Sequence, residues 1–280
     1  MLGYFGPAGT FTQQALLRIN DGQEMVPFDT VPKTLDAVRR GEVSAALVPI
    51  ENSVEGGVSA TLDSLMIDEP LRIIREVVIP VKFVLCARPG TTLEDVRNVL
   101  THPHAHAQTR GWIAKNLKNA VVTEGGSTAA AAQEVAKPES RFDAAICAQV
   151  AADTYGLEVL ADGVADNKHA LTRFVLVAKP GKLPAPTGSD KTTLVAYMFA
   201  DHTGALLEIL DQFAGRGVNL CRIESRPTKR SLGDYCFSID AEGHVAESRM
   251  AEALKGLHRV CKKVTFLGSY ARADAVMPRI

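Results

Sequence analysis

The sequence lacks the features that mark membrane, secreted or nucleic-acid-binding proteins. No apolar run approaches the roughly 20 residues that a membrane-spanning helix needs. Residues 1–7 contain no basic segment followed by a long apolar one, so we predict no signal peptide. The formal net charge at pH 7 is −1, without blocks of basic residues, which argues against nucleic acid or an anionic membrane as a partner. We therefore expect a cytoplasmic protein.

Cysteine is scarce, and its spacing argues against two common structural devices. The cysteines are an odd number, lie far apart and form no CxxC pair. This pattern disfavours a disulfide framework and a zinc site, and it predicts reduced, mostly buried thiols. The glycine-containing turns match neither GxGxxG nor a Walker loop, so a nucleotide is poorly supported. The five cysteines are Cys86, Cys147, Cys221, Cys236 and Cys261.

What the chain does contain is enough apolar sequence for about two folded domains. It has 280 residues, of which 46% are hydrophobic and 22% charged, as in soluble globular proteins. Residues 180–191 are rich in proline and glycine and therefore predict a linker. The pattern of strands and helices differs on its two sides.

Before the linker, apolar strands alternate with helices, which predicts an α/β fold with a mainly parallel sheet. Three strands are followed by turns rich in Gly, Ser and Thr that enter helices, near Gly9, Gly57 and Ser127. Free backbone N–H groups at a helix start attract anions, although a helix cap explains each single turn equally well. Together the three turns favour a small ligand with several negative charges.

A further polar group stands beside a buried-type strand at Thr172-Arg173-Phe174, which precedes the apolar residues 175–178. A hydroxyl and a guanidinium at a strand end suit a binding site, because the scaffold there is rigid. The alternative is an ordinary polar strand entry with a solvated arginine. Partners from elsewhere in the chain decide between the two.

The histidines at 102, 104 and 106 raise the possibility of a metal site, which we do not favour. They alternate along the chain, but no cysteine lies nearby and Pro103 interrupts regular geometry. A loop that enters a helix commonly holds such residues. We therefore predict no metal at this loop.

Residues 192–267 show the order strand, helix, strand, strand, helix, strand. This βαββαβ order within about 80 residues indicates a ferredoxin-like unit with its helices on one face of the sheet. Such a unit is too small for the main chemistry and suits a sensor or assembly module.

In combination, four motifs make the chain resemble the prephenate dehydratase family with a C-terminal ACT domain. The motifs are residues 6–12 (GPAGTFT), residues 51–56 (ENSVEG), His102-Pro103 with Gln108, and Thr172-Arg173-Phe174. In the tail, Gly204-Ala205-Leu206 and residues 224–227 (ESRP) resemble the phenylalanine-responsive motifs of ACT domains. The likeness covers nearly the full length, and the motifs are specific in this order.

The resemblance implies a domain organisation. Residues 1–179 would form the catalytic domain, as two α/β subdomains with a cleft between them, similar to periplasmic binding proteins. Subdomain A would comprise residues 1–78 and 162–179, and subdomain B residues 79–161. Residues 180–191 would be the linker and residues 192–280 the ferredoxin-like ACT regulatory domain.

The resemblance also implies an activity, the decarboxylating dehydration of prephenate to phenylpyruvate by a carbon–oxygen lyase in phenylalanine biosynthesis, without a metal or an organic cofactor. Thr172 would assist the departing hydroxyl group, and Arg173 would bind a substrate carboxylate or, alternatively, brace the loop. Glu51 and Glu55 are expected outside the first contact layer, because a carboxylate repels an anionic substrate. The remaining substrate contacts implied are Thr10, Asn52, Ser53, Thr101, Gln108 and Phe174, with capping hydrogen bonds or, for Phe174, core packing as the alternative.

One position departs from the family pattern. Many members have asparagine two residues before the threonine, where this chain has Ala170. The contribution of that asparagine is then absent or supplied elsewhere, with Asn167 as one alternative.

For the ACT domain, the resemblance implies feedback inhibition by phenylalanine, bound where two such domains pair. The homodimer or tetramer would assemble through the ACT and catalytic domains. The alternatives for the whole chain are an arogenate dehydratase and a non-catalytic small-molecule sensor. The effector contacts implied are Gly204, Ala205, Leu206, Asn219, Leu220, Glu224, Ser225 and Arg226.

Overall fold

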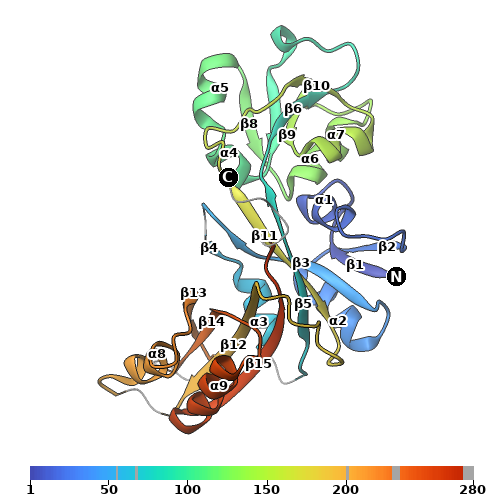
Figure 1. The fold of residues 1–280 in the computed structure, drawn as a ribbon. Coiled ribbons are helices and arrows are strands. Elements are labelled where there is room, and N and C mark those ends of the chain that lie inside the picture. The colour runs from blue at the N-terminus through green and yellow to red at the C-terminus, as the bar shows by residue number, and fades with distance from the viewer. Residues whose placement is uncertain (55, 67–68, 200–201, 229–233, 274–280) are drawn as a thin grey trace. The chain divides into compact units, whose positions relative to one another are not determined.

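The computed structural model describes residues 1–54, 56–66, 69–199, 202–228 and 234–273, and it confirms the predicted α/β fold class (Figure 1). The chain forms two compact units, each built from three stretches of sequence. The first comprises Met1–Thr34, Glu51–Gly56 and Val78–Phe174, and the second Leu35–Ile50, Gly57–Val77 and Val175–Ile280. All predicted catalytic and substrate-contact residues belong to the first unit, and all predicted effector contacts belong to the second.

A six-stranded sheet has the strand order β2-β1-β3-β11-β5, with β4 paired to β3. Strand β3 is apolar and buried up to Ile50 and then turns polar, so that Glu51 and Asn52 stand at its carboxyl end. The strands are β1 (Leu2–Phe5), β2 (Met25–Phe28), β3 (Ala45–Asn52), β4 (Gly56–Gly57), β5 (Arg72–Pro80) and β11 (Leu171–Ala178). The helices among them are α1 (Phe11–Leu17), α2 (Val31–Arg40) and α3 (Ser59–Leu65).

The first unit contains a five-stranded sheet of order β10-β6-β9-β7-β8 with helices on both faces (Figure 1). Alternate residues of its fully buried strands serve different cores: Cys86 lies in the same cluster as α6 and α7, and Leu85 in that of α4 and α5. The strands are β6 (Val84–Ala87), β7 (Asn98–Thr101), β8 (Val121–Glu124), β9 (Ala144–Cys147) and β10 (Glu158–Ala161). The helices are α4 (Pro103–Ala107), α5 (Arg110–Asn116), α6 (Thr128–Val135), α7 (Gln149–Tyr155) and the 3₁₀ turn η1 (Leu93–Asp95).

This sheet corrects the expectation of mainly parallel pairing. Strand β7 runs parallel to β8 and β9, whereas β6 is antiparallel to both β9 and β10. Alternating strands and helices predict parallel neighbours only where a helix crosses over between them. Here β6 follows β5 after a short connection, so no helical crossover precedes it.

In the second unit, the C-terminal segment has the predicted βαββαβ order, and its four-stranded sheet has the order β13-β14-β12-β15. Helices α8 and α9 cover one face, where Leu194, Ile239 and Phe213 are buried (Figure 1). Strand β12 begins at Asp190, inside the predicted linker. The elements are β12 (Asp190–Met198), α8 (Ala205–Ala214), β13 (Leu220–Pro227), β14 (Tyr235–Glu242), α9 (Ser248–Val260) and β15 (Cys261–Ala271).

The cysteines are free thiols, and all but Cys221 are buried. Cys86 and Cys147 lie on adjacent strands with their Sγ atoms 3.3 Å apart, and this hydrogen bond together with burial raises the pKa of the Cys147 thiol well above its usual value. The prediction of mostly buried thiols is confirmed. Within the described residues, every helix is too short or too polar to cross a membrane.

Candidate functional site

The candidate active site is organised by a hydrogen bond between two strand segments 120 positions apart. Asn52, the last residue of β3, donates from Nδ2 to Oγ1 of Thr172 in β11 at 3.0 Å. The Thr172 side chain is almost completely buried, so this bond lies in a region where water competes little. Both residues were predicted to belong to the site, and the fold brings them together.

A second bond fixes which end of the Asn52 amide faces the threonine. The backbone N–H of Val54 donates to Asn52 Oδ1 at 2.8 Å, so the NH₂ end is directed at Thr172. The Thr172 oxygen is therefore an acceptor in this pair, and its own proton points elsewhere. Accepting one hydrogen bond polarises a hydroxyl and makes it a better donor in the next. The geometry thus prepares Thr172 as a hydrogen-bond donor.

Ser53 joins the same two segments through its main chain and side chain. Its N–H donates to the Leu171 carbonyl, and its Oγ accepts from the Leu171 N–H, both at 2.9 Å. The amide that reaches Thr172 is that of Asn52 and not of Asn167, whose Oδ1 accepts from the His169 N–H at 2.9 Å. Asn167 therefore caps its own turn and does not replace the side chain that Ala170 lacks.

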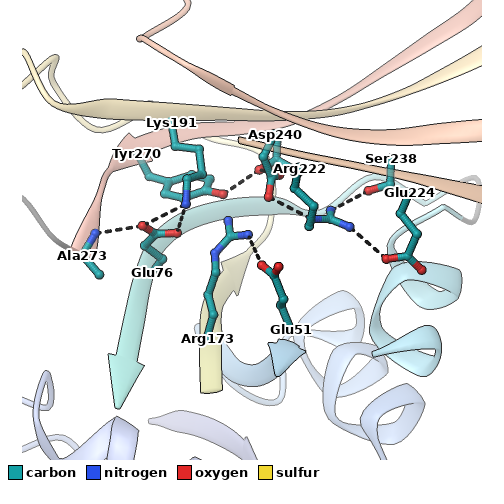
Figure 2. Close-up of polar contacts among 11 residues, drawn as sticks. Glu51, Glu76, Arg173, Lys191, Arg222, Glu224, Ser238, Asp240, Tyr270 and Ala273 are labelled. Atoms are coloured by element: carbon teal, nitrogen blue, oxygen red, sulfur yellow. Dashed lines mark hydrogen bonds and ion pairs between the residues drawn. The ribbon is translucent and has the colours of Figure 1, made fainter. Parts of the chain in front are cut away.

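Arg173 follows Thr172 in an extended strand, so the two side chains point to opposite faces of β11. The guanidinium is buried, and its Nη1 lies 3.4 Å from Oε2 of Glu51. Figure 2 shows the two side chains directed at each other. This pairing favours the alternative in which Arg173 braces the strand end. A direct role for Arg173 in binding substrate stays a prediction, and Glu55 lies outside the described residues.

Two of the predicted substrate contacts use their hydroxyl groups within the protein. Thr10 caps α1, where its Oγ1 accepts from the Gln13 N–H at 3.3 Å and donates to the Phe5 carbonyl at 3.2 Å. Thr101 is fully buried at the end of β7 and donates to the Ile146 carbonyl at 2.8 Å. These bonds match the capping and loop alternatives for both residues.

Gln108 and Phe174 have opposite surroundings. Gln108 ends helix α4 with a side chain that is 9% exposed, and its Oε1 has no hydrogen-bond partner among the described residues. A buried acceptor without a partner is costly, so a ligand that donates to it gains affinity. Phe174 is 1% exposed, which agrees with the alternative of core packing.

The three histidines lie at the start of α4. His106 Nδ1 is 2.8 Å from Glu124 Oε1, and the rings of His102 and His104 meet edge to face with centroids 4.8 Å apart. In the part of the chain that the structure describes, no three His, Cys, Asp or Glu side chains form a group suited to a metal ion.

In the second unit, a pocket of about 240 Å³ opens beside the start of α8. Gly204 caps this helix with a φ of 94°, a left-handed conformation that glycine adopts without strain. The pocket combines a helix N-terminus with apolar side chains, which suits an amino acid with a carboxylate and an apolar side chain. Its lining residues are Met198, His202, Gly204, Ala205, Leu206, Leu207, Ser225, Tyr235 and Phe237.

Strand β13 separates the predicted effector residues by their side of the strand. Ser225 lines the pocket, whereas its neighbours Glu224 and Arg226 alternate to the other face. There Arg226 Nη2 pairs with Asp63 of α3 at 2.7 Å, and Nη1 lies 3.0 Å from Ser59 Oγ.

Glu224 is held on that face by a set of polar contacts (Figure 2). Its Oε2 lies 3.1 Å from Arg222 Nη1, and Arg222 is bound in turn by Asp240 at 3.0 Å and by Ser238 at 2.8 Å. A Cβ at Gly57 would come within 2.0 Å of Glu224 Oε2, so only glycine fits there without displacing this carboxylate.

Asn219 and Leu220 are not among the described residues that line the pocket. The Asn219 carbonyl accepts from the Glu242 N–H at 2.8 Å, and Leu220 packs against the core under α8 and α9. Their predicted effector contacts stay predictions.

Comparison with known proteins gives this geometry a family. A model of the prephenate dehydratase family matches residues 2–182. A prephenate dehydratase from Amycolatopsis methanolica is 52% identical over 281 residues, which cover 100% of this chain and 91% of the relative. The chain belongs to the prephenate dehydratase family. The prediction made from its motifs is thereby confirmed, including the class of hydro-lyases to which the family belongs.

Solved structures of similar sequence agree with the fold. Prephenate dehydratase from Arthrobacter aurescens, in complex with L-Phe, has 53% identity and a TM-score of 0.93, with 100% of this chain and 92% of that chain covered. A structure described as a novel type of quorum-quenching acylase has 32% identity and a TM-score of 0.88, with 96% and 97% covered. The architecture of prephenate dehydratases is thus shared by a protein described by another activity.

Two residues near the candidate active site of this family member were not predicted from the sequence. Tyr155 in α7 donates from its hydroxyl to the Ala8 carbonyl at 2.9 Å and so supports the 6–12 motif; burial raises the pKa of this tyrosine. Asp166 accepts from the N–H groups of Gly111 and Trp112. Asp166 lies six residues before Thr172-Arg173-Phe174 but has no role assigned from the sequence, Tyr155 belongs to no motif, and only the fold shows their partners.

Proposed function

We propose that this chain converts prephenate to phenylpyruvate, carbon dioxide and water at the site around Thr172. The observation that carries this proposal is the oriented Asn52–Thr172 pair, in which the hydroxyl accepts from the amide and keeps its proton for a substrate. Family membership supplies the substrate, and the geometry supplies the group that the reaction requires.

The chemistry requires one proton for the leaving group. The bond from the ring to its carboxylate breaks and leaves its electron pair in the ring, while the ring carbon–oxygen bond breaks and the hydroxyl departs with its own pair. A proton taken up from solvent converts the departing hydroxide to water, and the aromatic ring of phenylpyruvate results. Aromatisation and loss of carbon dioxide supply the driving force, so the main task of the protein is to stabilise the departing oxygen.

Thr172 performs this task as an oriented hydrogen-bond donor. A positioned donor or acid of this kind contributes about 10²–10⁴ in rate. A threonine hydroxyl is a weak acid, and for this reason we assign Thr172 the donation of a strong hydrogen bond. Asn52 holds the acceptor side of the hydroxyl and thereby directs its proton toward the substrate.

Other side chains bind and brace. Gln108 offers its unpaired Oε1 to a hydroxyl group of the substrate, since a carbonyl oxygen accepts and cannot bind a carboxylate. Arg173 and Glu51 brace the ends of β11 and β3 through their ion pair. We retain Ser53 as a contact at the edge of the site, because its hydroxyl still has a proton to donate.

The test is turnover of the purified chain with prephenate, followed by the appearance of phenylpyruvate, with and without a chelator. We expect turnover that the chelator leaves unchanged. Turnover with arogenate but not with prephenate would make arogenate the substrate of the same site. Since one similar structure is described as an acylase, an acylase assay is a further arm. No turnover with any of these substrates, together with tight binding of prephenate, would mean that the chain is a sensor and not an enzyme.

We further propose that phenylalanine is the feedback inhibitor and binds the pocket at the start of α8. The Arthrobacter aurescens structure is a complex with L-Phe. The pocket of this chain lies at the N-terminus of α8, a helix of ten residues that can bind a carboxylate, and its apolar side chains can contact a ring. Calorimetric titration with phenylalanine tests this directly. Tyrosine in the same titration measures the selectivity of the pocket.

We also propose that the chain works in the cytoplasm as a homodimer or homotetramer paired through its ACT and catalytic domains. Support for pairing through the ACT domain comes from large apolar side chains that line the pocket and are exposed, with Leu207 68% and Tyr235 44% exposed. Strand β13 is moreover an edge strand of its sheet. Light scattering with and without phenylalanine tests the assembly; a monomer under both conditions would contradict it.

A further inference from the structure

Three backbone hydrogen bonds join the connection from β10 to β11, which leads to Thr172, to other segments of the first unit. The N–H of Val164 donates to the Phe83 carbonyl at 3.0 Å, and the N–H of Val81 donates to the Ala170 carbonyl at 2.8 Å. Between them, the N–H of Asp166 donates to the Gln108 carbonyl at 2.7 Å. The middle bond joins this connection to a residue of the candidate active site.

The Asp166 side chain binds the residues that follow Gln108 at the start of α5. Its Oδ2 accepts from the Gly111 N–H at 2.8 Å, and its Oδ1 accepts from the Trp112 N–H at 2.9 Å. Helix α5 has no capping bond from its own N-cap side chain at Thr109, so Asp166 supplies the cap from elsewhere in the chain. A Cβ at Gly111 would lie 2.8 Å from Oδ1, which is why glycine stands at that position.

These bonds define where Gln108 stands. Gln108 ends α4 just before α5 begins, and its buried Oε1 is the acceptor without a partner among the described residues. Its backbone is therefore held by Asp166 at the carbonyl, while the next turn is held by the Asp166 carboxylate. Because Asp166 precedes Thr172 by only six residues, one short segment carries the donor and fixes the acceptor.

We propose that Asp166 is a positioning residue for the reaction and acts through Gln108. It holds the turn between α4 and α5 so that the Gln108 amide meets the substrate bound at Thr172. This inference rests on the proposed function. A shift of about 1 Å in a positioning group costs up to about 10²-fold in rate, so loss of the carboxylate should be visible in kcat/KM.

The test is a double-mutant cycle with Asp166→Ala, Gln108→Ala and the double variant, measured as kcat/KM for prephenate. We expect each single change to lower kcat/KM by about tenfold or more. The double variant should be no worse than Gln108→Ala alone, because Asp166 has nothing left to position. If the two losses multiply instead, Asp166 does not act through Gln108 and the proposal is wrong.

Asp143 provides a matched control, a carboxylate that binds two successive backbone amides at the start of strand β7. Its Oδ2 accepts from the N–H groups of Arg97 and Asn98 at 2.9 and 2.8 Å, the same kind of grip on two successive amides in the same unit. We expect Asp143→Ala to lower the melting temperature about as much as Asp166→Ala does, without the loss in kcat/KM. Equal losses of kcat/KM in both variants would mean a general effect of stability and overturn the proposal.

Asp166→Asn covers the case in which the alanine variant fails to fold. Its side-chain oxygen still accepts one of the two N–H bonds, so it should fold and show an intermediate loss, again absent in the Gln108→Ala background. A wild-type chain without prephenate turnover would reject the proposed function, and the role of Asp166 with it. Additive losses on an active wild type reject only the role of Asp166.

Discussion

The two candidate sites of this chain are built in different ways. The active-site pair Asn52–Thr172 joins residues 120 positions apart, and each polar atom has a direction set by the strands that carry it. The effector pocket is made by the start of α8 and the three neighbouring strands β13, β14 and β12 of the C-terminal segment. In the first site, segments far apart in sequence are joined by a few hydrogen bonds. In the second, neighbouring elements of one segment form a pocket.

The comparison shows that the residues of one motif can have different roles. In the active site, predicted residues differ in how their hydroxyl groups are used: Thr10 and Thr101 donate to backbone carbonyls, whereas Thr172 accepts from the Asn52 amide. In the effector site they divide by strand alternation, since Ser225 faces the pocket and Arg226 faces α3. Residues adjacent in a motif therefore serve ligand and scaffold separately.

The largest expected effect follows from removing the oriented donor. Thr172→Ala should lower kcat by about 10²–10⁴, because the departing hydroxyl loses its hydrogen bond. Thr172→Ser keeps the hydroxyl and should retain most of the activity. Steady-state turnover with prephenate is the measurement, with circular dichroism to show that both variants fold. Equal turnover of Thr172→Ala and wild type would remove this residue from the mechanism.

A large effect on stability without a direct effect on either site is expected at Glu76 in β5. Its carboxylate accepts from Lys191 Nζ at 2.9 Å and from the Ala273 N–H at 2.8 Å, with the two side chains only 3% and 12% exposed (Figure 2). Glu76→Ala leaves a buried ammonium without this partner, which typically costs about 3–5 kcal/mol in free energy of unfolding. Chemical denaturation measures it.

The exposed pair of Lys33 and Asp29 is the control for that experiment. Their side chains are 62% and 84% exposed, and such pairs contribute at most about 1 kcal/mol. Asp29→Asn should therefore leave the unfolding midpoint nearly unchanged. A Glu76 variant that behaves like the Asp29 variant would show that the buried pair adds nothing to stability.

Much of the architecture was predictable because its signals are local. Apolar runs and helical spacing predict strands at 2–5 and 144–148 and the βαββαβ order, and the structure has β1 and β9 at these places and this order in its C-terminal segment. Strand β2 and helices α4 and α7 were not predicted. β2 contains Pro27, α4 begins with Pro103, and α7 is a seven-residue helix that packs largely through alanines, so each has a weak pattern.

The site was only partly predictable for a physical reason. Motif resemblance named Asn52 and Thr172, but which atom donates depends on the Val54 N–H bond, which no spacing reveals. Asp166 and Tyr155 were missed because each acts on a backbone group far away in sequence. Alternation along β11, by contrast, follows from the sequence once Thr172-Arg173-Phe174 is placed inside the strand and not before it.

An intermediate effect is expected where the two faces of β13 are compared by adjacent substitutions. Ser225→Ala should weaken phenylalanine binding, because Ser225 lines the pocket. Arg226→Ala should leave binding detectable but raise the residual turnover at saturating phenylalanine, because its contact with Asp63 of α3 is lost. Allosteric coupling is typically about 1–3 kcal/mol, so a change of roughly 5- to 150-fold in the effect of phenylalanine is the range to expect.

Calorimetry and turnover on the same preparations separate these outcomes. Arg249→Ala is the control, since Arg249 pairs with Glu247 at the surface of the same unit and with 50% of its side chain exposed. Loss of phenylalanine binding in Arg226→Ala would place that side chain in the pocket after all. Unchanged inhibition in Arg226→Ala would show that the contact with α3 carries no coupling.

The smallest effect expected compares two helix caps that the sequence marked as possible ligand turns. Thr10 and Ser127 accept from Gln13 N–H at 3.3 Å and from Ala130 N–H at 3.0 Å. Each alanine substitution should cost about 1 kcal/mol of stability, as the loss of a cap typically does. Because the Thr10 hydroxyl also donates to Phe5, we expect KM for prephenate to stay within about twofold of wild type in both variants. A tenfold rise in KM for Thr10→Ala alone would restore the predicted substrate contact, and the difference between the two caps would then measure what the substrate adds to an ordinary helix start.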